Sequence, residues 1–133
     1  MCSSDLVFSR AEGRKRFAES VRATADYFHV DGLDLDWEYP VVQGFPGHPR
    51  SPDDKRNFTL LLEEIRRESK DDFLLTFASG GYTGYIDSAI DWKSVVPLVD
   101  FIHVMSYDLV HGYSTVSGHH TPLYSTEIGR AHV

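Results

Sequence analysis

Apolar residues recur at three- and four-residue steps in two stretches of the chain, which is the spacing of one buried helix face. The first stripe lies within residues 9–28 and consists of Phe17, Val21, Ala25 and Phe28. Ser9 and Glu12 have the spacing of a capping box at its start. The second stripe consists of Phe58, Leu61, Leu62 and Ile65. It follows Ser51-Pro52-Asp53-Asp54, a helix-start pattern with an N-cap and an early proline. The spacing predicts two amphipathic helices.

Three short apolar runs favour strands, and they span residues 29–38, 73–79 and 101–109. Residues 40–50 contain three prolines and two glycines, which indicates a loop. Residues 86–97 show no clear period, and a short helix broken near Pro97 is the preferred interpretation. The resulting order alternates helix and strand three times. It predicts an α/β fold with a parallel sheet and helices packed outside it.

The first predicted strand carries acidic residues at every second position. In DGLDLDWEYP, residues 31–40, Asp34, Asp36 and Glu38 alternate with apolar residues. Side chains two positions apart lie on the same face of a strand, so the three acids would share one face. An edge strand with a solvated acidic face is one explanation, but strands between helices are usually covered. Covered carboxylates are costly unless protons are shared or partners supplied, so a functional site is favoured.

Cleavage of a glycosidic bond is the chemistry that such an acidic array suits. The reaction needs a carboxylic acid that stays protonated near neutral pH, so that it can protonate the leaving oxygen. Adjacent negative charges disfavour further ionisation, and an acidic array can therefore keep one member protonated. Glu38 is the candidate acid because it lies nearest the carboxyl end of its strand, where parallel α/β folds place active sites. Asp36 would share a proton with Glu38 and contact the substrate.

The acidic motif Asp31-x-x-Asp34-x-Asp36-x-Glu38 resembles the signature of glycoside hydrolase family 18, the chitinase family. Two further segments match: VDFIHVMSYDL, residues 99–109, resembles the sixth barrel strand of the family, and GHHTPLY, residues 118–124, resembles the segment that follows it. The resemblance covers nearly all of residues 7–126. It implies a fragment of a (β/α)8 TIM barrel, about strands 4 to 6 with their helices.

The resemblance also implies a retaining, substrate-assisted mechanism, in which the N-acetyl carbonyl of the substrate attacks the anomeric carbon. Glu38 would be the general acid and base. Asp36 would orient the acetamido group, with Asp34 supporting the charge of Asp36, and Tyr107 would hydrogen-bond the acetamido carbonyl. The implied sugar contacts are Asp108, Met105 and Tyr39, and Asp31 would give support from outside the site. Tyr82, Phe45 and other aromatic residues could stack on sugars, although most aromatic residues simply pack.

Hydrolysis of β-1,4-linked N-acetylglucosamine in chitin or its oligomers is the expected activity, and the resemblance implies no cofactor. One alternative is an endo-β-N-acetylglucosaminidase acting on N-glycans or cell wall. Another is a non-catalytic chitin-binding lectin of the same fold, but such relatives generally lose the acid at the position of Glu38. Because the remaining barrel strands are absent, we expect this fragment alone to be inactive. The resemblance implies a secreted or extracytoplasmic location, and a signal peptide cannot be observed in a fragment.

Composition excludes several partners. The net charge of −7 argues against nucleic acid, because phosphate binding requires a basic surface. No apolar run approaches the roughly 20 residues of a membrane span. The spacing of His111, His119 and His120 fits no zinc signature, so no metal site is predicted.

The two ends of the chain have an unusual relationship. MCSSDL, residues 1–6, and EIGRAH, residues 127–132, can be encoded by one short DNA segment read in opposite directions. That segment resembles a sequencing adapter. Residues 1–6 and 127–133 are therefore predicted to be non-native end sequence, and the remainder contains no cysteine.

Overall fold

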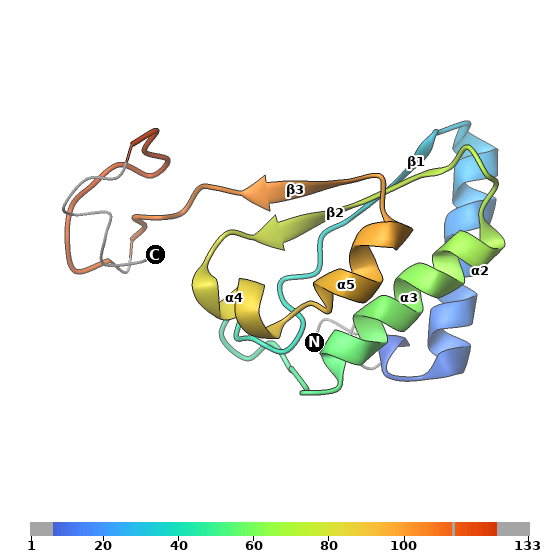
Figure 1. Cartoon of the computed structure of the whole chain (residues 1–133), viewed down its shortest axis with the longest axis horizontal. Helices are drawn as coiled ribbons and strands as arrows, with labels where there is room; N and C mark the ends of the chain where they lie inside the picture. Colours follow the sequence, from blue (N-terminus) through green and yellow to red (C-terminus); the bar gives the residue numbers. More distant parts are fainter. Residues whose placement is uncertain (1–6, 113, 125–133) are drawn as a thin grey trace.

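Three parallel strands form the centre of the structure, a computed structural model that describes residues 7–112 and 114–124. They are β1 (Gly32–Leu35), β2 (Leu74–Gly80) and β3 (Phe101–Met105), in the order β1-β2-β3. The register pairs Asp34 with Thr76, and Thr76 with Phe101. All three carboxyl ends therefore meet at one edge of the sheet (Figure 1).

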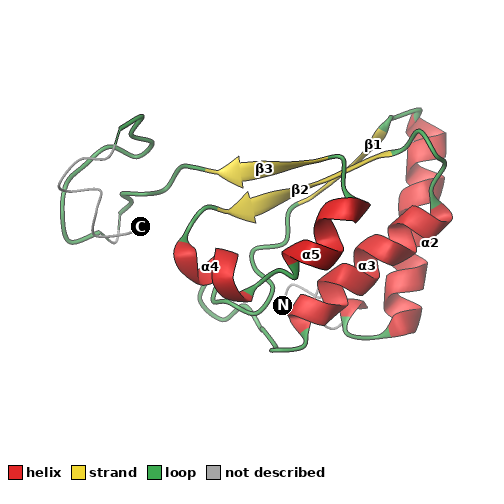
Figure 2. Cartoon of the chain, in the orientation of Figure 1, coloured by secondary structure: helices red, strands yellow, loops and turns green. Residues whose placement is uncertain are grey.

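The helices follow the predicted alternation. They are α2 (Ala11–Phe28), α3 (Asp54–Glu68), α4 (Thr83–Ser88) and α5 (Trp92–Val95), the last continuing into the 3₁₀ turn η1 (Val96–Leu98). Helices α2, α3 and α5 lie along the same face of the sheet (Figure 2). Helical structure before the last strand was expected within residues 86–97, as one short helix broken near Pro97. The structure instead contains the end of α4, then α5 and η1, and Pro97 lies inside the 3₁₀ turn.

The hydrophobic core lies between the sheet and α3. The predicted stripe of α3 is confirmed, since Phe58 is 2% exposed and Leu61, Leu62 and Ile65 are fully buried. Phe58 packs edge-on against Phe77 of β2, with ring centroids 5.1 Å apart, and also contacts Trp37 beyond β1 at 6.2 Å. Burying a side chain of this size stabilises a fold by about 2–3 kcal/mol. This packing joins α3 to β2 and to the segment that follows β1.

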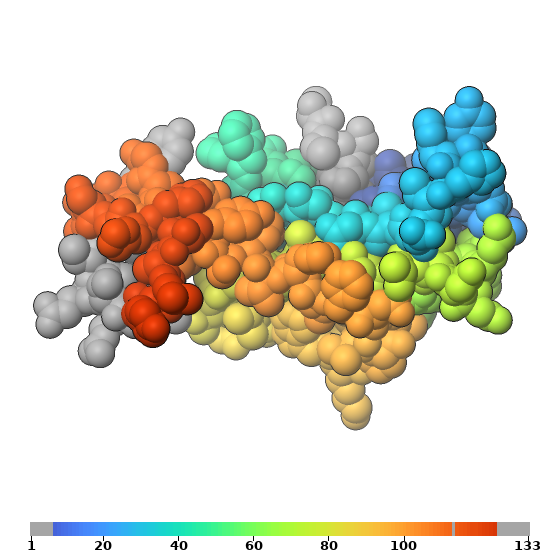
Figure 3. All heavy atoms as spheres, turned by 90° about the horizontal axis from the view of Figure 1, so that it is seen from above, coloured from blue at the N-terminus to red at the C-terminus, as the bar shows by residue number. Residues whose placement is uncertain are grey.

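The opposite face of the sheet carries no helix among the described residues. Figure 3, viewed onto this face, shows β1 in cyan and β3 in orange at the surface. Phe101 of β3 is 51% exposed there, and His103 and Asp34 are also exposed. Asp34 and His103 lie on this face together, with Nε2 of the histidine 3.6 Å from a carboxylate oxygen.

Two of the strands are shorter than predicted. The run 29–38 forms a ladder only over Gly32–Leu35, and the run 101–109 only over Phe101–Met105. A strand needs a hydrogen-bonded neighbour, and β2 offers β1 partners only from Leu74 to Phe77. Asp36, Glu38 and Tyr107 therefore lie on loops that continue from the strand ends.

Two details of α2 also differ from the prediction. Phe28 was assigned to the buried stripe but is 66% exposed, because it is the last helical residue before a left-handed C-cap at His29 (φ 55°). The N-cap is Arg10, without a side-chain capping bond, so the capping box expected from Ser9 is wrong. Near the start of α2, the side chain of Arg14 is buried, and its guanidinium donates a hydrogen bond to the carbonyl oxygen of Phe8 at 2.6 Å.

Helix α3 begins at Asp54, three residues after the predicted N-cap. The carboxylate of Asp54 is buried (1% exposed) and accepts the backbone N–H of Ser51 at 2.6 Å. It also accepts the N–H of Val41 at 3.4 Å. Asp54 therefore ties the start of α3 to the loop that follows the acidic motif.

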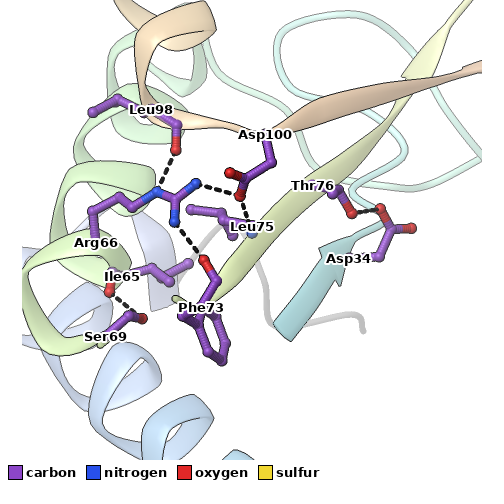
Figure 4. A network of polar contacts seen from close by, with 9 residues as sticks. All are labelled: Asp34, Ile65, Arg66, Ser69, Phe73, Leu75, Thr76, Leu98 and Asp100. Carbon is purple, nitrogen blue, oxygen red and sulfur yellow. Dashed lines mark hydrogen bonds and ion pairs between the residues drawn. The ribbon is translucent and has the colours of Figure 1, made fainter. Parts of the chain in front are cut away.

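Arg66 of α3 connects the amino ends of β2 and β3 (Figure 4). Its guanidinium donates to the carbonyl oxygens of Leu98 and Phe73, both at 2.6 Å, and to the Asp100 carboxylate at 2.7 Å. The same carboxylate oxygen of Asp100 accepts the N–H of Leu75 at 2.8 Å. The network joins the helix to two strands at the edge opposite the acidic loop.

No helix in the described ranges is long and apolar enough to span a bilayer. The segments predicted to be non-native, residues 1–6 and 127–133, lie outside the described residues, so that assignment stays a prediction.

Candidate active site

The acidic residues alternate in burial with the apolar residues between them. Asp34, Asp36 and Glu38 are exposed, whereas Leu35 and Trp37 are 7% and 5% exposed. The alternation continues past the last strand residue, because Trp37 remains packed between aromatic rings of α3 and of the segment before α2. The packing of the apolar side chains therefore directs the acids away from the helices.

A cavity of about 410 Å³ opens at the carboxyl ends of the three strands. Its lining comes from the end of β1 (Glu38, Tyr39), the end of β2 (Gly80, Gly81, Tyr82) and the end of β3 (Met105, Tyr107, Asp108, Leu109, His111). Parallel α/β folds place their active sites at this edge. Five of the residues singled out from the sequence thus border one cavity, although they are far apart along the chain.

The other three predicted site residues do not line this cavity. Asp34 lies within β1, where it accepts a hydrogen bond from the hydroxyl of Thr76 (Figure 4). Asp36 lies between Asp34 and Glu38 and borders a second cavity of about 360 Å³ that Glu38 also lines. Asp31 precedes β1, at the opposite end of the strand, and borders a separate pocket of about 120 Å³ with Arg22. The structure brings Asp36 to Glu38 but leaves Asp31 remote from the cavity.

Two tyrosines of the cavity lining, Tyr39 and Tyr82, form a cluster with the buried Tyr85. Tyr39 packs edge-on against Tyr82 and Tyr85, with ring centroids 5.7 Å and 5.4 Å away. Burial raises the pKa of Tyr39, and the neighbouring Glu38, through its charge and a side-chain hydrogen bond, raises it further. Burial and the charge of Glu38 also raise the pKa of Tyr82. These phenols therefore stay protonated and can donate hydrogen bonds at neutral pH.

Tyr82 lines the cavity; the sequence offered it only as one of several aromatic residues that could stack on sugars, and did not assign it to this site. Tyr82 is the N-cap residue of α4, directly after the Gly80-Gly81 pair that ends β2. A Cβ at Gly80 would lie 2.9 Å from Cγ of Tyr85 and 3.1 Å from Cε1 of Tyr82. The Gly-Gly pair after an apolar run was the available signal, because it marks a place where side chains approach the backbone closely.

The described residues contain no group of three or more His, Cys, Asp or Glu side chains arranged to hold a metal ion. Asp108 has an imidazole neighbour, since the Nδ1 atom of His120 lies 3.3 Å from its carboxylate. The polar groups that converge on the cavity are therefore carboxylates, phenols and imidazoles, which transfer protons and bind hydroxyl and amide groups.

Comparison with known proteins gives the family directly. The sequence pattern of "Glycosyl hydrolases family 18" matches residues 4–133. The chain belongs to this family. Chitinase A1 of Niallia circulans is 36% identical over 124 residues, which are 88% of this chain and 18% of that protein. Oviduct-specific glycoprotein of Ovis aries is 35% identical over 90% of this chain and 23% of its own length.

Among solved structures, chitinase ChiA74 from Bacillus thuringiensis superposes with a TM-score of 0.87 and 36% identity. The match covers 94% of this chain but 21% of that enzyme. The chain therefore spans about a fifth of each of these three relatives. The predicted fold class, part of a (β/α)8 barrel, is confirmed.

Proposed function

We propose that this chain is the segment of a longer family 18 hydrolase that supplies its general acid and base. We call that longer protein the parent hydrolase. Its proposed substrate is chitin or an oligomer of β-1,4-linked N-acetylglucosamine. The observation that carries the proposal is the shared cavity, in which Glu38 meets Tyr107 and Asp108 from another strand. A secreted or extracytoplasmic location belongs to the same proposal.

In the proposed first step, Glu38 protonates the glycosidic oxygen while the substrate's own N-acetyl carbonyl attacks the anomeric carbon. Asp36 orients the acetamido group, and Asp34 supports the charge of Asp36. Tyr107 donates a hydrogen bond to the attacking carbonyl. In the second step Glu38 takes a proton from water, which opens the intermediate with net retention of configuration. The substrate, Glu38 and one water molecule supply every group that reacts, so the mechanism invokes no cofactor.

Asp108, Met105 and Tyr39 are the proposed sugar contacts. All three line the cavity beside Glu38, and Met105 is 9% exposed, so it offers an apolar surface at the cavity wall. Asp31 lies at the other end of β1, so it would not touch the substrate and could affect the site only by stabilising the strand.

The test is the substitution Glu38→Gln in the parent hydrolase. Glutamine keeps the shape but cannot donate the proton, so turnover of a chitin oligomer should fall at least about 100-fold while binding stays nearly unchanged. Glu63→Gln, on the exposed face of α3, is the matched control and should keep parental turnover. Turnover by Glu38→Gln within about tenfold of the parent would contradict the assignment.

A sugar-binding protein without activity is the second candidate, because one relative is named a glycoprotein and not a chitinase. Binding of chitin oligomers by the intact parent without any turnover would establish that alternative. Faster release of an N-glycan than of chitin oligomers would instead favour the endo-β-N-acetylglucosaminidase.

A further inference from the structure

Tyr107 and Asp108 lie on a segment that follows β3 and is outside its strand ladder. Both follow the end of β3 at Met105, and both are exposed. Asp108 also adopts a left-handed backbone conformation (φ 56°), which non-glycine residues adopt infrequently. A strand ladder therefore does not explain why these two side chains remain directed into the cavity.

His120 contacts three consecutive residues of this segment. Its ring stacks on Tyr107, with centroids 6.3 Å apart and planes inclined by 19°. Its Nδ1 atom lies 3.3 Å from a carboxylate oxygen of Asp108. Its carbonyl oxygen accepts the backbone N–H of Leu109 at 3.1 Å. Within the described residues, His120 provides the ring contact of Tyr107 and the imidazole contact of Asp108.

We propose that His120 is a positioning residue, which holds Tyr107 and Asp108 in the orientation that the sugar requires. This inference rests on the proposed function of the same cavity. A group that is already ordered before substrate binds spares the complex the entropy of ordering it. The backbone bond to Leu109 brings residues 109–120 back onto the strand end, and the imidazole then fixes two side chains at once.

The chain offers a matched control at the adjacent position. His119 is exposed and has the same side chain, but it makes none of the three contacts described for His120. Replacing His119 removes an imidazole from the same loop without removing the contacts that His120 makes with Tyr107 and Asp108.

Two further substitutions separate the contacts of His120. His120→Asn keeps a hydrogen-bonding amide near Asp108, and His120→Phe keeps a ring on Tyr107.

In the parent hydrolase, His120→Ala should lower kcat/KM for a chitin oligomer about tenfold or more, whereas His119→Ala should leave it unchanged. His120→Asn and His120→Phe should each recover part of the loss. The effects of His120→Ala and Asp108→Ala should be non-additive, because the two side chains act through one contact. General damage to the loop would instead give additive effects and no rescue.

Values for His120→Ala within about twofold of the parent, or strictly additive effects with Asp108→Ala, would overturn the inference and leave the proposed function intact. A parent that fails to turn over chitin oligomers would instead contradict the proposed function. Crystal structures of the His120→Ala and His119→Ala variants then test the inference about His120 independently of turnover. Displacement of Tyr107 and Asp108 only in His120→Ala supports it, and unchanged positions overturn it.

Discussion

The ring of Tyr82 packs edge-on against that of Tyr39, with centroids 5.7 Å apart and planes at 84°, and both rings line the cavity that contains Glu38. Each phenol comes from the end of a different strand. Their contact therefore depends on the sheet, since β1 and β2 must end side by side for the two rings to meet.

We expect the stability of the parent hydrolase to fall as pH rises above about 10, the usual pKa of tyrosine. The pKa values of Tyr39, Tyr82 and Tyr85 are all raised in the fold, with burial as the main cause. A raised pKa contributes stability that is fully present below the unfolded value and is lost as pH rises through the folded one. The thermal midpoint of unfolding, measured at several pH values from about 8 to about 11 so that they bracket the usual tyrosine pKa, should show the decline.

Tyr39→Phe should make that alkaline decline shallower, because the phenylalanine variant has no proton to lose at this position. Tyr27→Phe, at a 77% exposed position on α2, controls for the removal of one phenol. Equal slopes for the parent and Tyr39→Phe would show that the environment of Tyr39 does not favour its neutral form.

The acidic motif could be predicted because its information is local. A two-residue period assigns Asp34, Asp36 and Glu38 to one face of an extended segment, and all three are exposed although the strand itself ends at Leu35. Tyr82 could not be placed in this way. Its position depends on where β2 ends and on the space left by Gly80, and both are properties of the packed sheet.

Gly80→Ala should reduce hydrolysis by the parent, by about tenfold or more, because a methyl group at this position must displace the rings of Tyr82 and Tyr85. The matched control is Gly84→Ala in α4, where the new Cβ would lie at an ordinary 3.7 Å from the Tyr82 ring. Alanine is also the better helix former, so Gly84→Ala should be neutral or stabilising by about 0.5–1 kcal/mol. Comparable kinetic losses in both variants would argue against a specific role for the space at Gly80.

The helix boundaries show the same limit on prediction. Periodicity located the buried stripe of α3 correctly, but the sequence of Ser51 and Pro52 suggested an earlier start than Asp54. The Asp54 carboxylate accepts the backbone N–H of Ser51, which is a local contact, and also that of Val41, thirteen residues earlier. The contact with Val41 joins two segments that are separate in the sequence, so no local pattern contains it. Phe28 was misplaced for a related reason, since the helix ends at that residue.

The ion pair between Arg66 and Asp100 likewise has no sequence signature, yet it makes a testable contribution to stability. Arg66→Ala should lower the free energy of unfolding by about 2 kcal/mol, because the carbonyl oxygens of Leu98 and Phe73 lose charged donors. Arg67→Ala is the matched control. Its side chain is 62% exposed and, among the described residues, pairs with the neighbouring helix acids Glu64 and Glu68, so the loss should stay below about 0.5 kcal/mol.

The contribution of this network to stability should depend on pH, because Asp100 must be ionised to pair with Arg66. The N–H of Leu75 and the guanidinium of Arg66 hold the pKa of Asp100 below its usual value. A lowered pKa contributes stability that is present above the unfolded value of about 3.9 and is lost as pH falls through the folded one. Asp100→Asn keeps an oxygen for Leu75 but removes the charge. The thermal midpoint of the parent should therefore exceed that of Asp100→Asn at neutral pH, and the gap should close below about pH 4. A gap that stays constant down to the lowest pH would mean that shape, and not charge, accounts for the role of Asp100.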